Sequence, residues 1–121
     1  MLPGRGLSVS TRAAGAAVER RARRHYLVRG YRILAANAWA GGYELDLVVR
    51  RGRELVFVEV KAKTDATFVD PVEMVGPEKQ RRLRQAAESW LARHPELDGL
   101  EVSFDVMAER GGRLERLANA F

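Results

Sequence analysis

Residues 54–63 read ELVFVEVKAK, and this stretch decides the fold class. Its first half is apolar at successive positions, which is typical of a strand buried on both faces in the centre of a sheet. Glu59 and Lys61 then place charges on the face that begins with Leu55 and Phe57. A charge on the inner part of a central strand costs several kcal/mol unless it is paired or bound to a cation. The stretch therefore predicts a central strand that carries a functional site.

The preceding strand, predicted over residues 44–50, supplies acidic partners. Its side chains alternate, so that Leu45 and Leu47 share one face while Glu44 and Asp46 share the other. A turn at residues 51–53 joins it to the central strand, which makes the two strands antiparallel neighbours.

The register between these strands depends on which residues form the turn. If Gly52 is the first of two central turn residues, Asp46 lies directly opposite Glu59. If Gly52 is the second, Glu44 lies opposite Glu59 and Asp46 is its diagonal neighbour. Both registers gather these acids and Lys61 on one face, with neighbours about 4.5–8 Å apart.

Carboxylates and an ammonium in that space form a site for a hard cation. Mg²⁺ binds one or two carboxylates together with waters and substrate phosphate oxygens. A bound metal polarises a phosphoryl oxygen and acidifies water, and a lysine can stabilise the developing negative charge. The pattern predicts phosphodiester hydrolysis. The alternative is that Glu59 and Lys61 are solvated charges at a strand edge.

The remaining elements complete an α/β domain. We expect a flexible N-terminal segment over residues 1–10 and a single domain over residues 11–121. A helix over residues 13–28 would be capped by Ser10 or Thr11, and a second helix would begin at Pro77. Further strands are expected at residues 31–37, 100–108 and 113–117, with a loop at residues 37–42. The order predicts a mixed central sheet flanked by helices.

Composition limits the class of protein. The 121 residues suit one domain, and no apolar stretch reaches the roughly 18 residues of a membrane span. The absence of cysteine excludes disulfides and fits the cytoplasm. The net charge of +5 favours polyanion partners such as DNA, although many arginine-rich proteins are merely well solvated.

The motifs carry a family resemblance. Asp46 followed by Glu59-Val60-Lys61 resembles the PD-(D/E)xK nuclease signature. Residues 11–121 are also similar to the YraN-like bacterial proteins. The matching stretches are residues 30–34 (GYRIL), 44–47 (ELDL), 56–61 (VFVEVK), 79–83 (KQRRL) and 104–106 (FDV).

The resemblance implies a restriction-endonuclease-like fold, similar to that of archaeal Holliday-junction resolvases. It implies that Asp46 and Glu59 bind Mg²⁺ or Mn²⁺ and that Lys61 is catalytic. By the same analogy, a homodimer is expected.

Two further acids are candidates for the site. Glu19 matches a family glutamate that completes the site in resolvase-like nucleases. Its alternative role is a helical ion pair with Arg23. Glu44 would add a carboxylate or hold outer-shell water.

Basic residues provide candidate nucleic-acid contacts. Lys63 follows the catalytic pattern, and Lys79, Arg81 and Arg82 cluster on the second helix. They would contact the DNA backbone, or they form a solvated helix face. We therefore expect a Mg²⁺-dependent endonuclease acting on DNA, including branched or structured DNA. The alternative is a nucleic-acid-binding or partner-binding module that retains the fold without catalysis.

Overall fold

The computed structural model describes residues 3–64 and 75–121, with side chains described within residues 15–62 and 75–121. The elements follow in the order α1 (Pro3–Leu27), β1 (Arg32–Ala40), β2 (Tyr43–Arg51), β3 (Glu54–Thr64), α2 (Pro77–Ala92), the 3₁₀ helix η2 (Pro95–Leu97), β4 (Glu101–Arg110) and β5 (Arg113–Leu117). Among the described residues, no helix is long and apolar enough to cross a membrane.

The strands form one mixed sheet with the order β1-β2-β3-β4-β5. Neighbouring strands are antiparallel except β3 and β4, which are parallel. The connection from β3 to β4 carries α2 across one face of the sheet, as parallel neighbours require. The predicted mixed sheet flanked by helices is confirmed, and the architecture is that of a restriction-endonuclease-like α/β domain.

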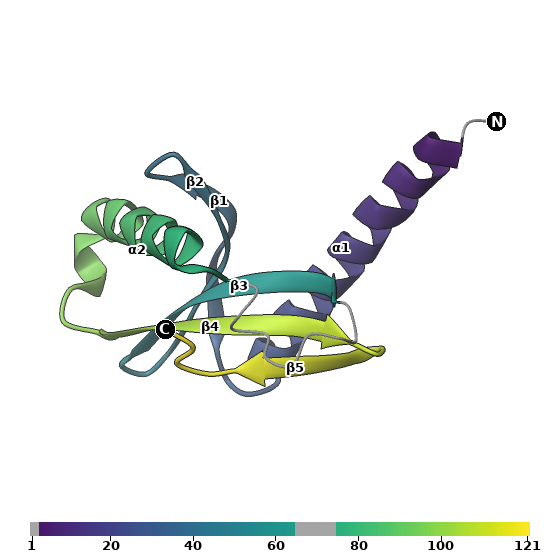
Figure 1. Ribbon diagram of the computed structural model, residues 1–121. Coiled ribbons are helices and arrows are strands. Elements are labelled where there is room, and N and C mark those ends of the chain that lie inside the picture. The colour runs from purple at the N-terminus through teal and green to yellow at the C-terminus, as the bar shows by residue number, and fades with distance from the viewer. Residues whose placement is uncertain (1–2, 65–74) are drawn as a thin grey trace.

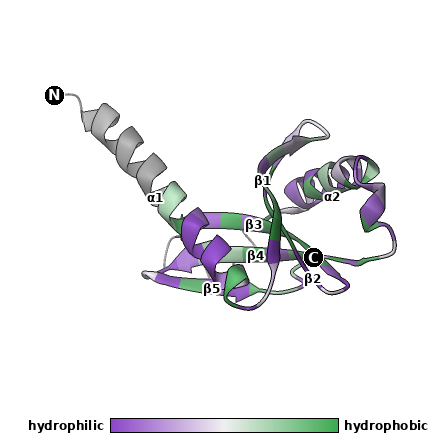
Figure 2. Cartoon of the chain, turned by 180° about the vertical axis from the view of Figure 1, so that it is seen from behind, coloured by the Kyte–Doolittle hydropathy of each residue, from purple (hydrophilic) through white to green (hydrophobic). Residues whose placement is uncertain are grey.

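The helices cover opposite faces of the sheet (Figure 1). On β3, Leu55 and Phe57 pack in a core under α2, whereas Val56 and Val58 pack in a core under α1. In the view from behind, α1 lies in front of the sheet, and β3 carries hydrophobic residues along its length (Figure 2). The predicted burial of this strand on both faces is confirmed, because all four side chains are at most 3% exposed.

The hairpin of β1 and β2 is longer than predicted. The loop expected at residues 37–42 is wrong, because β1 continues to Ala40 and only Gly41 and Gly42 form the turn. Both glycines have positive φ, 58° and 76°, as a type I′ turn requires. A Cβ on Gly41 would lie 2.9 Å from Ser89 Oγ, so the turn rests directly on α2.

This docking changes the direction of one predicted core residue. Leu45 was expected to share a face with Leu47, but it packs in the α2 core while Leu47 packs under α1. The hairpin arches over α2 (Figure 1), which brings the Leu45 end of β2 against that helix.

The first helix also differs from the prediction. The cap at Ser10 or Thr11 is wrong, because α1 begins at Pro3. The division into a flexible segment at residues 1–10 and a domain at residues 11–121 stays a prediction. The second helix begins at Pro77 as predicted, and β5 returns after the turn at Gly111 and Gly112.

Candidate active site

The register of β2 against β3 brings the two predicted acids together. The ladder pairs Leu47 with Val58. Gly52 has a φ of 59° and is the first residue of a two-residue turn. This is the first of the two predicted registers, and one further step along it places Asp46 opposite Glu59.

The regular ladder ends at this point because a side chain replaces a backbone acceptor. The Val60 N–H donates a hydrogen bond of 2.9 Å to Asp46 Oδ2. This contact holds the Asp46 carboxylate beside β3 at Val60. Glu59 is the residue directly before Val60 on that strand. The end of the ladder therefore fixes the position of the first predicted metal ligand.

Asp46 and Glu59 line one open pocket of about 300 Å³. The tip of the β1–β2 hairpin forms one wall, and the first turn of α2 forms another. The pocket is lined by Trp39, Gly42, Tyr43, Glu44, Asp46, Glu59 and Lys79. Glu44 is exposed at this pocket, as expected for an acid that contributes from the rim.

Two lysines contact the buried Glu59, which is only 5% exposed. Lys79 Nζ lies 2.7 Å from Glu59 Oε2, and Lys61 Nζ lies 3.6 Å from the same oxygen. Burial alone would lower the pKa of Lys79, but its hydrogen bond to Glu59 outweighs this and the pKa is raised. The charge of Glu59 is therefore matched by neighbouring ammonium groups.

Asp46 forms no ion pair of 4 Å or less with a described side chain. Burial, together with the neighbouring charge of Glu59, raises the pKa of Asp46 to about 7, although the hydrogen bond from Val60 partly opposes these effects. Glu19 on α1 adds a smaller contribution of the same sign. Burial also lowers the pKa of Lys61, and the proximity of Lys79 adds to this. The pocket thus holds closely spaced acids whose repulsion a cation would relieve.

The two outlying acids take different places. Glu19 is half-buried on α1, and its charge acts on Asp46. The alternative pairing of Glu19 with Arg23 does not occur among the described ion pairs. Glu44 reaches the pocket from β2.

The predicted nucleic-acid contacts separate into three groups. Lys79 turns inward to Glu59 and belongs to the pocket. Arg81 and Arg82 are exposed and pair with Glu78 on the same helix. Lys63 lies in β3, but its side chain is outside the part of the chain that the structure describes.

Sequence reasoning placed Lys79 on the surface and so missed its role in the pocket. A signal was present, because Lys79 stands four residues before Leu83 and continues the buried stripe of Leu83, Ala86 and Trp90 on α2. A helix position on that stripe faces the sheet.

The donor set fits a hard divalent ion with few protein ligands. Within the described residues, no group of three or more histidine, cysteine or acidic side chains is placed to hold a metal. Asp46 and Glu59 supply two carboxylates, which is the number that Mg²⁺ takes when waters and substrate phosphate fill its other positions. Oxygen donors suit Mg²⁺ or Mn²⁺ rather than a softer metal.

A second buried aspartate, Asp105 on β4, shows what a structural carboxylate looks like in this protein. It is 1% exposed and accepts hydrogen bonds from Tyr26 Oη at 2.7 Å, Arg116 Nε at 2.9 Å and the Asn119 N–H at 3.1 Å. These contacts tie α1 and the C-terminal residues to the sheet. Within the described part of the chain, Asp46 has no comparable set of donors, and this difference separates the two roles.

Comparisons with known proteins find a family model and relatives that match most of this chain. The model of the "Uncharacterised protein family UPF0102" matches residues 18–108, which include Asp46, Glu59 and the two lysines that contact Glu59. The UPF0102 protein YraN of Escherichia coli (strain SMS-3-5 / SECEC) is 40% identical over 114 residues, covering 93% of this chain and 87% of that protein. A UPF0102 protein of Pectobacterium carotovorum subsp. carotovorum (strain PC1) is 42% identical over 114 residues, covering 93% and 97%.

Proposed function

The chain belongs to the uncharacterised protein family UPF0102, and we propose that it is a metal-dependent endonuclease that hydrolyses phosphodiester bonds in DNA. The observation that supports this proposal is the pairing of Asp46 with Glu59 in one open pocket beside two lysines. Two acids on neighbouring strands with a lysine two residues after the second form the pattern expected for this chemistry. The basic net charge of +5 suits a polyanionic substrate.

Asp46 and Glu59 would hold Mg²⁺ or Mn²⁺. The raised pKa of Asp46 supports this assignment, because a carboxylate that burial and a neighbouring acid destabilise gains most from a bound cation. When bound, the ion would polarise a phosphoryl oxygen and acidify a water molecule.

The remaining side chains have roles that follow from their positions. Lys61 would donate hydrogen bonds to the attacking water and to the phosphate oxygen on which charge develops. Lys79 would hold the Glu59 carboxylate in position through its 2.7 Å ion pair. Glu44 and Glu19 would accept hydrogen bonds from water around the ion. Lys63 and the exposed arginines of α2 would contact the DNA backbone.

We further propose that the substrates include branched or structured DNA, that the protein acts as a homodimer and that it works in the cytoplasm, where such DNA lies. Symmetric junctions would require two active sites related by a two-fold axis. These assignments rest on the resemblance to junction resolvases.

A second candidate function is a nucleic-acid-binding or partner-binding module without catalysis. The observation in its favour is that the Lys79 ammonium lies 2.7 Å from Glu59 Oε2 and matches the charge of this carboxylate. Such a site would be stable without an ion, and the basic surface would still bind DNA.

Cleavage assays separate the two candidates. The purified protein is incubated with junction, flap and single-stranded DNA in Mg²⁺, Mn²⁺ or EDTA, beside Glu59→Ala. Glu88→Ala is the matched control, because Glu88 is an exposed glutamate on α2. We expect metal-dependent cleavage by wild type and Glu88→Ala, and none by Glu59→Ala.

Two outcomes decide against these functions. Equal behaviour of wild type and Glu59→Ala on every substrate would exclude the nuclease. Absence of DNA binding at low salt, measured by fluorescence anisotropy, would exclude a nucleic-acid-binding module as well.

A further inference from the structure

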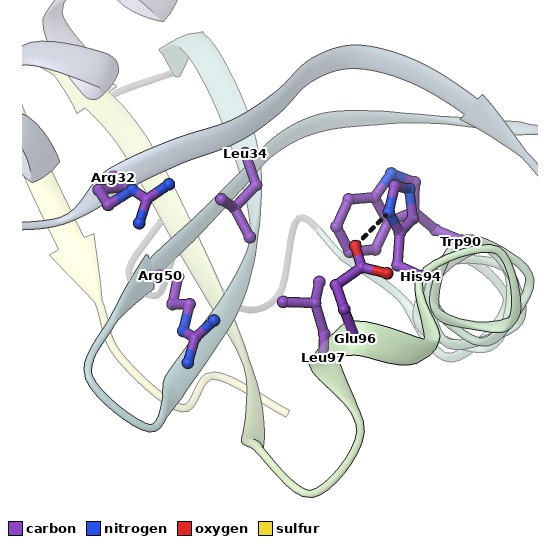
Figure 3. Close-up of a pocket in the computed structure, with 7 residues that line it drawn as sticks. All are labelled: Arg32, Leu34, Arg50, Trp90, His94, Glu96 and Leu97. Atoms are coloured by element: carbon purple, nitrogen blue, oxygen red, sulfur yellow. Dashed lines mark hydrogen bonds and ion pairs between the residues drawn. The ribbon is translucent and has the colours of Figure 1, made fainter.

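A second pocket, here called the arginine pocket, lies near the other end of α2 from the acids. Its volume is about 280 Å³, and its walls come from β1, β2, the end of α2 and η2 (Figure 3). Trp90 in its lining stands 11 residues after Lys79, which corresponds to ~16 Å along the helix. The arginine pocket shares no lining residue with the acidic pocket.

Two arginines face each other on one wall. Arg32 and Arg50 are direct partners in the β1–β2 ladder, and both line the pocket. Like charges directly opposite on neighbouring strands destabilise the pair. Placing an anion between the two guanidinium groups would turn this repulsion into attraction.

Neither arginine has a carboxylate partner among residues 15–62 and 75–121, whose side chains the structure describes. Arg50 Nε donates a hydrogen bond of 2.9 Å to the Gly52 carbonyl, which leaves its charge unmatched and its two Nη groups available. Arg32 is exposed and makes no side-chain hydrogen bond or ion pair within that part of the chain. By contrast, carboxylates pair with Arg21, Arg51, Arg110 and Arg116.

The opposite wall contains two stacked aromatic rings. The His94 ring stacks on Trp90 with centroids 4.0 Å apart and an interplanar angle of 28°. Glu96 Oε2 lies 3.1 Å from His94 Nδ1, so the carboxylate turns toward the ring pair and not toward the arginines (Figure 3). Leu34 and Leu97 supply apolar surface between the two walls.

The chemistry of the two walls selects the ligand. Guanidinium groups bind phosphate through paired, charge-assisted hydrogen bonds, and flat rings pack on aromatic and apolar surfaces. The Glu96 carboxylate can accept a hydrogen bond from an amino group of a base. The pocket is far larger than the ~30 Å³ of a water molecule and close to the lower limit of ~300 Å³ for small-ligand sites.

We propose that the arginine pocket binds one nucleotide, with its phosphate between Arg32 and Arg50 and its base toward His94 and Glu96. The nucleotide is either free or one unit of a nucleic-acid strand, since both carry the same recognised groups. The proposal does not require the acids of the other pocket to be catalytic.

Binding measurements in EDTA test the site apart from any metal chemistry. The full chain is titrated with dAMP, deoxyadenosine, inorganic phosphate and an oligo(dA) of twelve nucleotides, followed by calorimetry. We expect dAMP or the oligonucleotide to bind, and deoxyadenosine and inorganic phosphate to bind at least tenfold more weakly. Binding of dAMP indicates a free nucleotide as ligand, and binding of the oligonucleotide alone indicates a unit of a strand.

Variants identify the residues. Arg32→Gln and Arg50→Gln should each weaken binding about tenfold or more, because each removes a charge-assisted contact. Arg113→Gln is the matched control, since it removes the same charge from an exposed position on β5, and it should change affinity less than twofold. Arg50→Lys keeps the positive charge but removes the planar guanidinium group that donates paired hydrogen bonds, so it also should weaken binding.

The proposal is overturned if neither dAMP nor the oligonucleotide binds wild type at millimolar concentration, or if Arg113→Gln weakens binding as much as Arg32→Gln. Arg32 is exposed, so its variant will fold even if Arg50→Gln does not. Glu59→Ala should bind the nucleotide as wild type does, so loss of cleavage and loss of nucleotide binding are distinguishable.

Discussion

Asp46→Asn should stabilise the metal-free protein while removing a ligand of the proposed metal site. The amide is almost the same size as the carboxylate, and its oxygen can still accept the 2.9 Å hydrogen bond from Val60. The substitution removes the negative charge that burial and Glu59 make unfavourable. A functional carboxylate that lowers stability is a common consequence of building an active site.

The magnitude follows from the pKa of Asp46, which rises from 3.8 to about 7 on folding. Each tenfold change in the acid constant corresponds to ~1.4 kcal/mol, so ionisation of Asp46 lowers the free energy of unfolding by at most ~4 kcal/mol. The folded pKa is the higher one. The contribution of protonated Asp46 to the free energy of unfolding is therefore fully present below about pH 3.8. It decreases as the pH rises toward 7 and is lost above that pH.

Urea denaturation in EDTA at pH 4, 5, 6, 7 and 8 measures this difference. Asp46→Asn and wild type should have nearly equal unfolding free energies at pH 4, and the variant should be more stable by about 2–4 kcal/mol at pH 8. Asp105→Asn is the control, because Asp105 is also buried but is paired with Arg116 and Tyr26. That variant should be destabilised at pH 8. The reasoning is refuted if Asp46→Asn is less stable than wild type at pH 8, or if the difference does not change with pH.

Three other measurements follow from the same contacts. Mg²⁺ at millimolar concentration should raise the melting temperature of wild type and not of Asp46→Asn, and equal shifts in both would exclude Asp46 as a ligand. Lys79→Met should lower the free energy of unfolding by about 1–3 kcal/mol, because it removes the closer partner of the buried Glu59. Chemical denaturation at pH 7 measures this loss, and an unchanged free energy of unfolding would contradict the assigned ion pair. Gly41→Ala should lower the melting temperature more than Gly42→Ala, because both have positive φ but only Gly41 would meet α2, and equal effects would argue against the docking of the hairpin on that helix.

Local patterns accounted for the central part of the domain. Successive apolar residues predicted β3 as a strand buried on both faces, and Gly52 predicted the turn between β2 and β3 with two possible registers. These features depend on side-chain alternation and on the backbone freedom of one glycine, both of which act over a few residues. For the same reason, Asp46 and Glu59 could be placed together before the structure was known.

The length of the β1–β2 hairpin was not predicted, because contact with α2 helps to stabilise its tip. Gly41 lies against that helix, and the same contact brings Leu45 into the α2 core. Segments far apart in the chain decide such contacts, so short-range periodicity carries little information about them.

The sequence by itself determined which two strands carry the acids, because alternation and turn geometry are local properties. Only the tertiary structure decided that Lys79 contacts Glu59, that Asp105 is enclosed by Tyr26 and Arg116, and that Arg32 and Arg50 share a pocket with the end of α2. Each of these contacts depends on where a helix docks on the sheet. That position is set by the fit of buried side chains from separate segments, which no single stretch of the chain contains.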